Sequence, residues 1–236
     1  MALPSSGILK LTTIAKEVGH SFTENVSLGG MSDTAGFSAP DKVSDFYNYS
    51  HISTGLTSAL YTQDLTSTTS WDIFQGESEI ATLSDYDGRE AKLVIQYING
   101  TTSTSYRGDF QIGATIIIGE TTYDLSQNRT GWSTSTNDSS TYSGASFNTL
   151  STGGSGRRWN VSNQVPGSSG TGTSVDETVE ETGYHVYAET SSPATNGTNF
   201  WLTSPTTELD SSSLEFSFVS FGSNVGTFKV YLDIIS

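Results

Sequence analysis

"LEFSFVSFGSNVGTFKVYLDII", residues 214–235, gives the clearest indication of the fold class. In its first half Leu214, Phe216 and Phe218 fall on one side of an extended chain, and the polar residues between them fall on the other. The second half, "FKVYLDI", alternates in the same way. Because a period of two is typical of a strand with one buried face, the sequence predicts two β-strands separated by a glycine-containing turn.

Similar runs recur from residue 55 onward, with turn residues between them. The further predicted strands are at residues 55–62, 71–75, 78–84, 90–98, 109–118, 120–125, 157–162, 183–189 and 199–204. Residues 130–182 are rich in Gly, Ser and Thr, which predicts large surface loops. Thr, Tyr, Phe and Val suit half-buried pleated surfaces, so the pattern predicts an all-β sandwich or barrel.

The charge of the chain limits its partners. The formal net charge is −15, with ten Lys and Arg residues in total, so a polyanion is repelled and we expect no nucleic-acid partner. There are no cysteines, which excludes disulfides, thiolate metal sites and cysteine nucleophiles. No apolar run approaches the ~20 residues of a membrane span, and the start lacks the pattern of a secretory signal. We therefore expect synthesis without standard export and no membrane insertion.

Four motifs between residues 159 and 233 carry a family resemblance. They are "WNVSNQVPGSSGTGTSVDET", "GYHVYAETS", "FWLTSP" and "LEFSFVSFGSNVGTFKVYL". In this order they resemble the MAM domain, an adhesion-type module, and the last resembles an aromatic hairpin of that family. The resemblance implies a jelly-roll or concanavalin-like β-sandwich. The disulfides of the family are absent here, so packing alone must hold the sandwich together.

The order of the motifs is unusual for that family. "KLVIQYINGTTSTSYRGDFQIGATIII", residues 92–118, resembles the C-terminal piece of a MAM domain but precedes the other motifs. This order suggests a circularly permuted sandwich, in which residues 55–125 supply the later strands of the family and residues 126–236 supply the earlier ones. The alternative is an unpermuted jelly roll with partial likeness.

Candidate ligand sites follow from carboxylates and aromatic residues. The resemblance points to Asp176 and Glu189, with Asp109, as ligands of Ca²⁺, which takes six to eight oxygen atoms. The alternative is that Asp176 caps a turn and Glu189 is solvated. Trp132 and Tyr142 lie in the predicted loop region, where an aromatic ring can stack on a sugar. We predict that these two residues bind a glycan; the alternative is that they pack in the core or in a hairpin.

Nothing in the sequence predicts catalysis. His20, His51 and His185 lie beside no nucleophile elbow. The carboxylates of residues 176–181 form a charge run at a loop end, which is typical of a solvated face rather than a glycosidase pair. We therefore expect a non-enzymatic protein.

Residues 1–54 differ from the rest of the chain. "LPSSGILKLTTIAKEVG", residues 3–19, contains an apolar run and one short helix, which is marginal alone and must pack against something. With "SDFYNY", residues 44–49, it resembles a leader of virion structural proteins of tailed bacteriophages. The resemblance implies a docking arm at residues 1–54 and a sandwich at residues 55–236. The alternative is that residues 1–54 pack on their own domain. The predicted docking anchors are Ile8, Leu11, Ile14, Val18, Phe46 and Tyr47.

These resemblances predict a function. We expect a virion structural protein, made in the host cytoplasm, that docks on other virion proteins through its arm. It would be a homo-oligomeric tail, neck or fibre appendage whose sandwich meets a host-surface glycan or protein. The alternative is a head decoration or cement protein.

Overall fold

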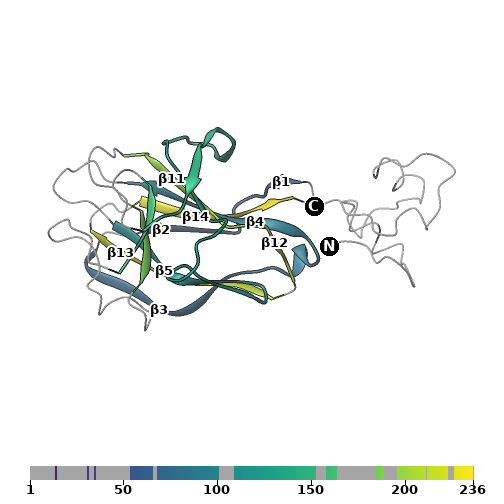
Figure 1. The fold of residues 1–236 in the computed structure, drawn as a ribbon, viewed down its shortest axis with the longest axis horizontal. Coiled ribbons are helices and arrows are strands. Elements are labelled where there is room, and N and C mark those ends of the chain that lie inside the picture. The colour runs from purple at the N-terminus through teal and green to yellow at the C-terminus, as the bar shows by residue number, and fades with distance from the viewer. Residues whose placement is uncertain are drawn as a thin grey trace.

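The computed structural model of the chain describes a β-sandwich (Figure 1). The described residues are 14, 31, 35, 54–65, 68–100, 109–152, 158–163, 184–188, 196–210, 212–222 and 226–235. Among them no helix is long and apolar enough to cross a membrane.

Eight of the described strands form one antiparallel sheet, here called sheet A. In spatial order they are β1 (Gly55–Leu56), β14 (Gly226–Ile234), β4 (Glu90–Asn99), β11 (Asn199–Thr203), β7 (Ser133–Ser135) and β8 (Phe147–Thr149), with β2 (Tyr61–Leu65) on β14 and β12 (Thr207–Glu208) on β4. Gly55 is the register partner of Ile234, so the first and last described strands of the sandwich meet at one place.

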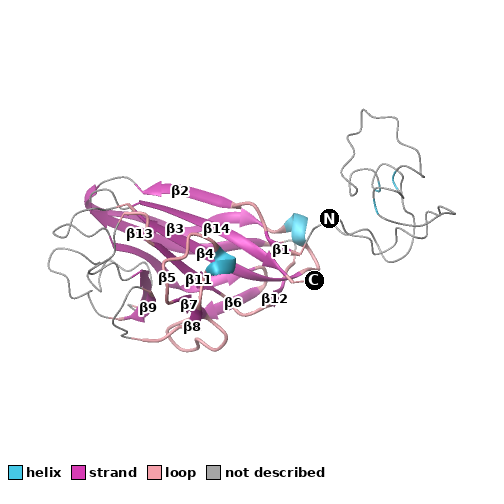
Figure 2. Cartoon of the chain, turned by 90° about the horizontal axis from the view of Figure 1, so that it is seen from above, coloured by secondary structure: helices cyan, strands magenta, loops and turns pink. Residues whose placement is uncertain are grey.

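Six of the described strands form the second antiparallel sheet, sheet B. In spatial order they are β3 (Thr68–Thr82), β13 (Ser213–Gly222), β5 (Asp109–Ile118), β10 (His185–Ala188) and β9 (Trp159–Ser162), with β6 (Thr121–Asp124) on β5. Figures 1 and 2 show the two sheets stacked face to face. The predicted all-β jelly-roll sandwich is confirmed.

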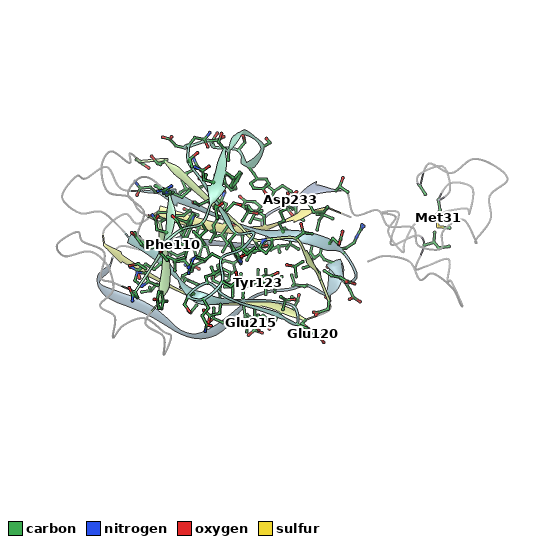
Figure 3. The ribbon with its side chains drawn as sticks, viewed as in Figure 1. Met31, Phe110, Glu120, Tyr123, Glu215 and Asp233 are labelled. Carbon is green, nitrogen blue, oxygen red and sulfur yellow. The ribbon has the colours of Figure 1, made fainter. Side chains whose placement is uncertain are left out.

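The core lies between the sheets and is made by the alternation that the sequence shows. On β5 the inward side chains run from Phe110 to Ile118, and on β14 they run from Phe228 to Ile234. Phe110 stands at the centre of an aromatic cluster, with ring centroids 4.8 Å from Phe228 and 5.2 Å from Tyr97 (Figure 3). Such packed rings contribute beyond the area that they bury.

The expected aromatic hairpin at residues 214–235 is not a hairpin. Its two strands, β13 and β14, lie in different sheets, and each pairs with strands from elsewhere in the chain. Phe218 of β13 meets Phe228 of β14 across the core, with ring centroids 4.7 Å apart. Both strands carry a full apolar face, and placing one in each sheet buries these two faces against each other.

The region predicted as large loops, residues 130–182, contains strands. β7 and β8, which were not predicted, extend sheet A beyond β11, whereas β9, an edge strand of sheet B, lies within the run predicted at residues 157–162. β7 reads Ser-Thr-Ser, so it carries no apolar alternation that could reveal it. Earlier in the chain, the two runs predicted at 71–75 and 78–84 form one strand, β3. Later in the chain, β12 was not predicted.

Candidate functional site

A concavity lined by described residues lies on the outer face of sheet A. It is a pocket of about 830 Å³ bounded by the strands on one side and by a loop on the other. Its lining residues are Gly55, Leu56, Gln96, Ile98, Ser140, Thr141, Tyr142, Ser143, Asn199, Trp201, Lys229, Tyr231 and Asp233. This volume is in the range of small-molecule sites.

Strand register brings the pocket floor together from three distant segments. Gln96 of β4 has Lys229 of β14 as its register partner on one side and Trp201 of β11 on the other. In the next outward row Ile98 lies between Thr227 and Asn199. Their sequence neighbours point into the core, so the same alternation that builds the core turns these side chains outward.

A hydrogen-bond chain fixes the polar side chains of the floor. The Tyr231 hydroxyl donates to Oε1 of Gln96 over 2.8 Å, and Nε2 of Gln96 donates to Oδ1 of Asn199 over 2.7 Å. Nδ2 of Asn199 then donates to the carbonyl oxygen of Gly197 over 2.8 Å. Gln96 and Asn199 are buried, so these bonds set the orientation of both amides.

The loop between β7 and β8 forms one wall of the pocket. Its short 3-10 turn, Tyr142–Gly144, places Tyr142 against Trp201, with ring centroids 5.7 Å apart. Nε1 of Trp201 donates to the carbonyl oxygen of Ser139 over 2.8 Å. Within the loop, Asn137 donates to the Gly144 carbonyl and accepts from the Ser146 amide. The wall is therefore bonded both to the sheet and to itself.

The pocket is lined by one cationic side chain, one anionic side chain and two tyrosine hydroxyls. Lys229 and Asp233 both line it, and Figure 3 labels Asp233 near the end of β14. Burial, and then the Asp233 carboxylate, raise the pKa of Tyr142. Burial also raises the pKa of Tyr231. Both hydroxyls therefore stay protonated at neutral pH and can donate hydrogen bonds.

Of the two predicted glycan-binding residues, the structure brings one to the pocket. Tyr142 is half-buried in the wall described above. The expectation for Trp132 is wrong, because its side chain is 1% exposed and its ring packs against Tyr123 at 5.5 Å. The ring fills the core, so neither of its faces is available to a sugar.

The predicted calcium ligands are not brought together among the described residues. Asp109 begins β5, while Asp176 and Glu189 lie outside the described residues. In the described part of the chain no three His, Asp or Glu residues gather into a metal-binding group. The calcium site stays a prediction.

One predicted docking anchor is described. Ile14 has helical conformation, and its side chain is fully buried within this chain. A partner could therefore contact Ile14 only after it is uncovered. The other predicted anchors, Ile8, Leu11, Val18, Phe46 and Tyr47, lie outside the described residues.

Sequence reasoning missed most of the floor. Gln96, Trp201 and Tyr231 each lie in a run that was read only as an alternating strand. The available signal was that the outward positions of three strands carry amides, aromatic rings and charges. These residues can be recognised as one site only when the register between the strands is known, because the three segments are far apart in the chain.

His185 lies on the outer face of sheet B and is 3% exposed. Its register partners are Gly113 on β5 and Ser162 on β9. Among the described residues neither of its ring nitrogens has a hydrogen-bond partner. Burial lowers the pKa of His185 to about 4, so the ring is neutral in the folded chain.

We expect His185 to make the chain less stable in acid. Between pH 6.5, its ordinary pKa, and about pH 4, the unfolded chain binds a proton that the folded chain does not. The free energy of unfolding therefore falls as the pH falls, by about 3 kcal/mol from this residue in total. Urea unfolding at pH 7.5 and pH 4.5 should show a smaller pH dependence for His185→Leu. An equal pH dependence in both chains would contradict this account.

A comparison with known families agrees with the architecture. Residues 126–234 match the MAM domain, meprin/A5/mu, which is an adhesion-type domain. The match covers somewhat less than half of the chain and includes strands β7 to β14. It confirms the MAM resemblance noted at residues 159–233. No solved structure matches this chain.

Proposed function

We propose that this chain is a non-enzymatic structural protein of a tailed-phage virion. In this proposal residues 1–54 dock on other virion proteins, and the sandwich is displayed as an adhesion-type domain on a tail, neck or fibre. The match of residues 126–234 to an adhesion-type domain supports the display role. The leader-like sequence of residues 3–19 supports the docking role.

The observation that supports this division of labour is that the core cluster of the described residues draws no member from the arm. The first described strand of the sandwich begins at Gly55, and the core cluster is drawn from residues 65–234. Ile14 and Met31 of the arm are buried, but neither belongs to that cluster. A body with its own core can be displayed while the arm is used elsewhere.

Display of many copies on a virion would allow weak single-site contacts to hold the particle on a host surface. Many identical copies on a virion multiply a weak single-site affinity for a host-surface glycan or protein through avidity. We accordingly propose a homo-oligomeric assembly, made in the host cytoplasm and found in the virion. The net charge of −15 supports a protein that stays soluble at high local concentration.

We also infer that the sandwich is a circular permutation of the matched family. The matched range begins at residue 126, yet β4 and β5, which precede it, lie in the interior of the two sheets. Gly55 and Ile234 are register partners, so the ends of the body are close enough to have been joined in an unpermuted ancestor.

The test is a chain that lacks residues 1–54. We expect it to be soluble and to unfold cooperatively at nearly the melting temperature of the full chain, because the core cluster is retained. Particles assembled with it as the sole copy should lack the protein, as measured by mass spectrometry of purified virions. Incorporation at the normal level would contradict the docking role, and so would a truncated chain that fails to fold.

Imaging of particles that carry the full chain distinguishes a location on the tail, neck or fibres from a location on the capsid. Density on the tail, neck or fibres agrees with the proposal. Density on the capsid lattice favours the alternative, a head decoration or cement protein that clamps capsomers through the same arm.

A further inference from the structure

We propose that the pocket on the outer face of sheet A binds a neutral pyranose sugar of a glycan. The inference rests on the adhesion part of the proposed function and names its ligand class. It does not depend on the virion part.

A pyranose needs two kinds of surface at once. Its C–H face packs on aromatic rings, and its hydroxyls both donate and accept hydrogen bonds in the ring plane. The pocket offers the first through the half-buried rings of Tyr142 and Tyr231. Trp201 is 2% exposed, so it supports these two rings and does not itself meet the sugar. Trp201 packs between the two tyrosines, with ring centroids 5.7 Å from Tyr142 and 6.2 Å from Tyr231.

The floor offers the second kind of surface in a fixed orientation. The hydrogen-bond chain uses one N–H of the Gln96 amide and one of the Asn199 amide. A primary amide carries two N–H groups, so each residue has a second donor for a sugar oxygen. The Tyr231 oxygen donates its proton to Gln96 and can still accept from a hydroxyl. Since these groups are held before binding, little side-chain entropy is lost when a sugar binds.

The charges favour a neutral sugar over an acidic one. Asp233 can accept from two hydroxyls, and Lys229 can donate to another. These two groups balance each other within the pocket, while the chain as a whole has a net charge of −15. A sialic or uronic acid would therefore approach an unfavourable field, and a neutral hexose would not.

The edge of the pocket, here called its lip, can accommodate a further sugar unit of a longer glycan. Leu56, on the edge strand β1, is 39% exposed and lines the pocket. It is one of two large apolar side chains with such exposure among the described residues. An apolar lip beside a polar floor gives a second sugar unit a surface to pack on.

The experiment titrates the full chain with methyl glucoside, methyl galactoside, methyl mannoside and N-acetylglucosamine, and with sialic and glucuronic acids for comparison. Saturation-transfer NMR detects binding, and calorimetry measures it. We expect at least one neutral sugar to bind with a dissociation constant of about a millimolar, as befits a ligand of this size. The acidic sugars should bind at least about tenfold more weakly.

Variants locate the binding. Tyr231→Ala should weaken it at least about tenfold, because both the ring and the bond to Gln96 are lost. Lys229→Ala should weaken binding, because a hydrogen-bond donor of the pocket is lost. Tyr231→Phe should weaken binding, whereas Tyr123→Phe removes a hydrogen-bonded hydroxyl elsewhere and should not. Each variant must keep the melting behaviour of the parent chain to be counted.

Three results would overturn the inference: no neutral sugar binds at 20-fold above the expected constant, roughly 20 mM; acidic sugars bind more tightly than neutral ones; or the pocket variants bind as the parent does. Any of these, with normal incorporation of the chain into particles, leaves the virion proposal standing. Sugar binding by a chain that is absent from particles supports the pocket and rejects the virion role.

Discussion

Gly226→Ala is expected to remove most of the folding stability of the chain. Gly226 begins β14 with a φ of +115°, which L-residues rarely adopt. A Cβ atom there would lie 2.0 Å from the carbonyl oxygen of Ile98 and 2.6 Å from the amide nitrogen of Gly100. Both are backbone atoms at the end of β4, so they cannot move away as a side chain would. We expect a loss of at least about 4 kcal/mol, a large share of the stability of a typical domain.

Gly55→Ala is the matched control for this substitution. Gly55 has a similar φ of +106°, but a Cβ atom there would meet nothing within 4 Å. It therefore reports the backbone strain alone, which we expect to cost about 1 to 2 kcal/mol. Urea unfolding of the two variants and the parent chain measures both effects. Equal losses in the two variants would show that the contact with β4 contributes nothing.

The parts of the fold that local pattern specifies were predictable. The run at residues 109–118 predicted a strand with the same bounds as β5, and the run at 227–235 predicted β14 within a residue or so. In both, apolar residues occupy alternate positions over their length, which is the requirement of a strand that covers a core. The alternation also predicted which side chains are buried, as for Phe216 and Phe228.

The parts that depend on distant partners were not predictable. β7 is a strand because it pairs with β11, whose residues lie about seventy positions later in the chain. β13 and β14 follow one another directly, but the pattern of each does not say whether they pair or face each other. Position alone likewise gave no reason to bury Trp132, which lies in a Gly- and Ser-rich region and yet packs into the core.

Only part of the candidate site could be predicted, because the rest depends on pairing between distant strands. Tyr142 was identified because an aromatic residue in a polar loop is unusual. Gln96 and Asn199 looked like ordinary outward residues of strands. They become a site only when β4 and β11 pair in the register that puts their amides 2.7 Å apart. The sequence contains both residues, but only the pairing of the two strands brings their side chains together.

Residues 126–236 alone, the part that contains the family match, are expected not to fold. In sheet A, β4 separates β14 from β11 and pairs with both. In sheet B, β5 has the same place between β13 and β10. Without these two strands each sheet divides into pieces, and Phe110 and Tyr97 leave the centre of the core. Circular dichroism should show a largely unordered chain with no cooperative melting transition.

A permuted chain is the matched control, because it restores the two strands from the other end. It runs from residue 128 to residue 235, through a linker of about four residues, and on from residue 54 to residue 127. Gln127 and Asn128 are both exposed, so opening the chain between them removes little packing. The register partners Gly55 and Ile234 show that the linker has a short distance to cross. We expect this chain to fold and to melt within about ten degrees of the parent, a change of one or two kcal/mol at this size.

The two chains together test the permutation. If residues 126–236 fold alone, β4 and β5 are not required, and the matched segment is a complete domain to which earlier residues were added. If the fragment is unfolded and the permuted chain is folded, the order of the two halves is interchangeable while both are needed. That result is expected of one sandwich that is a circular permutation of the matched family. An unfolded permuted chain would mean that the order seen here is required for folding, which would contradict the inferred relation to the family.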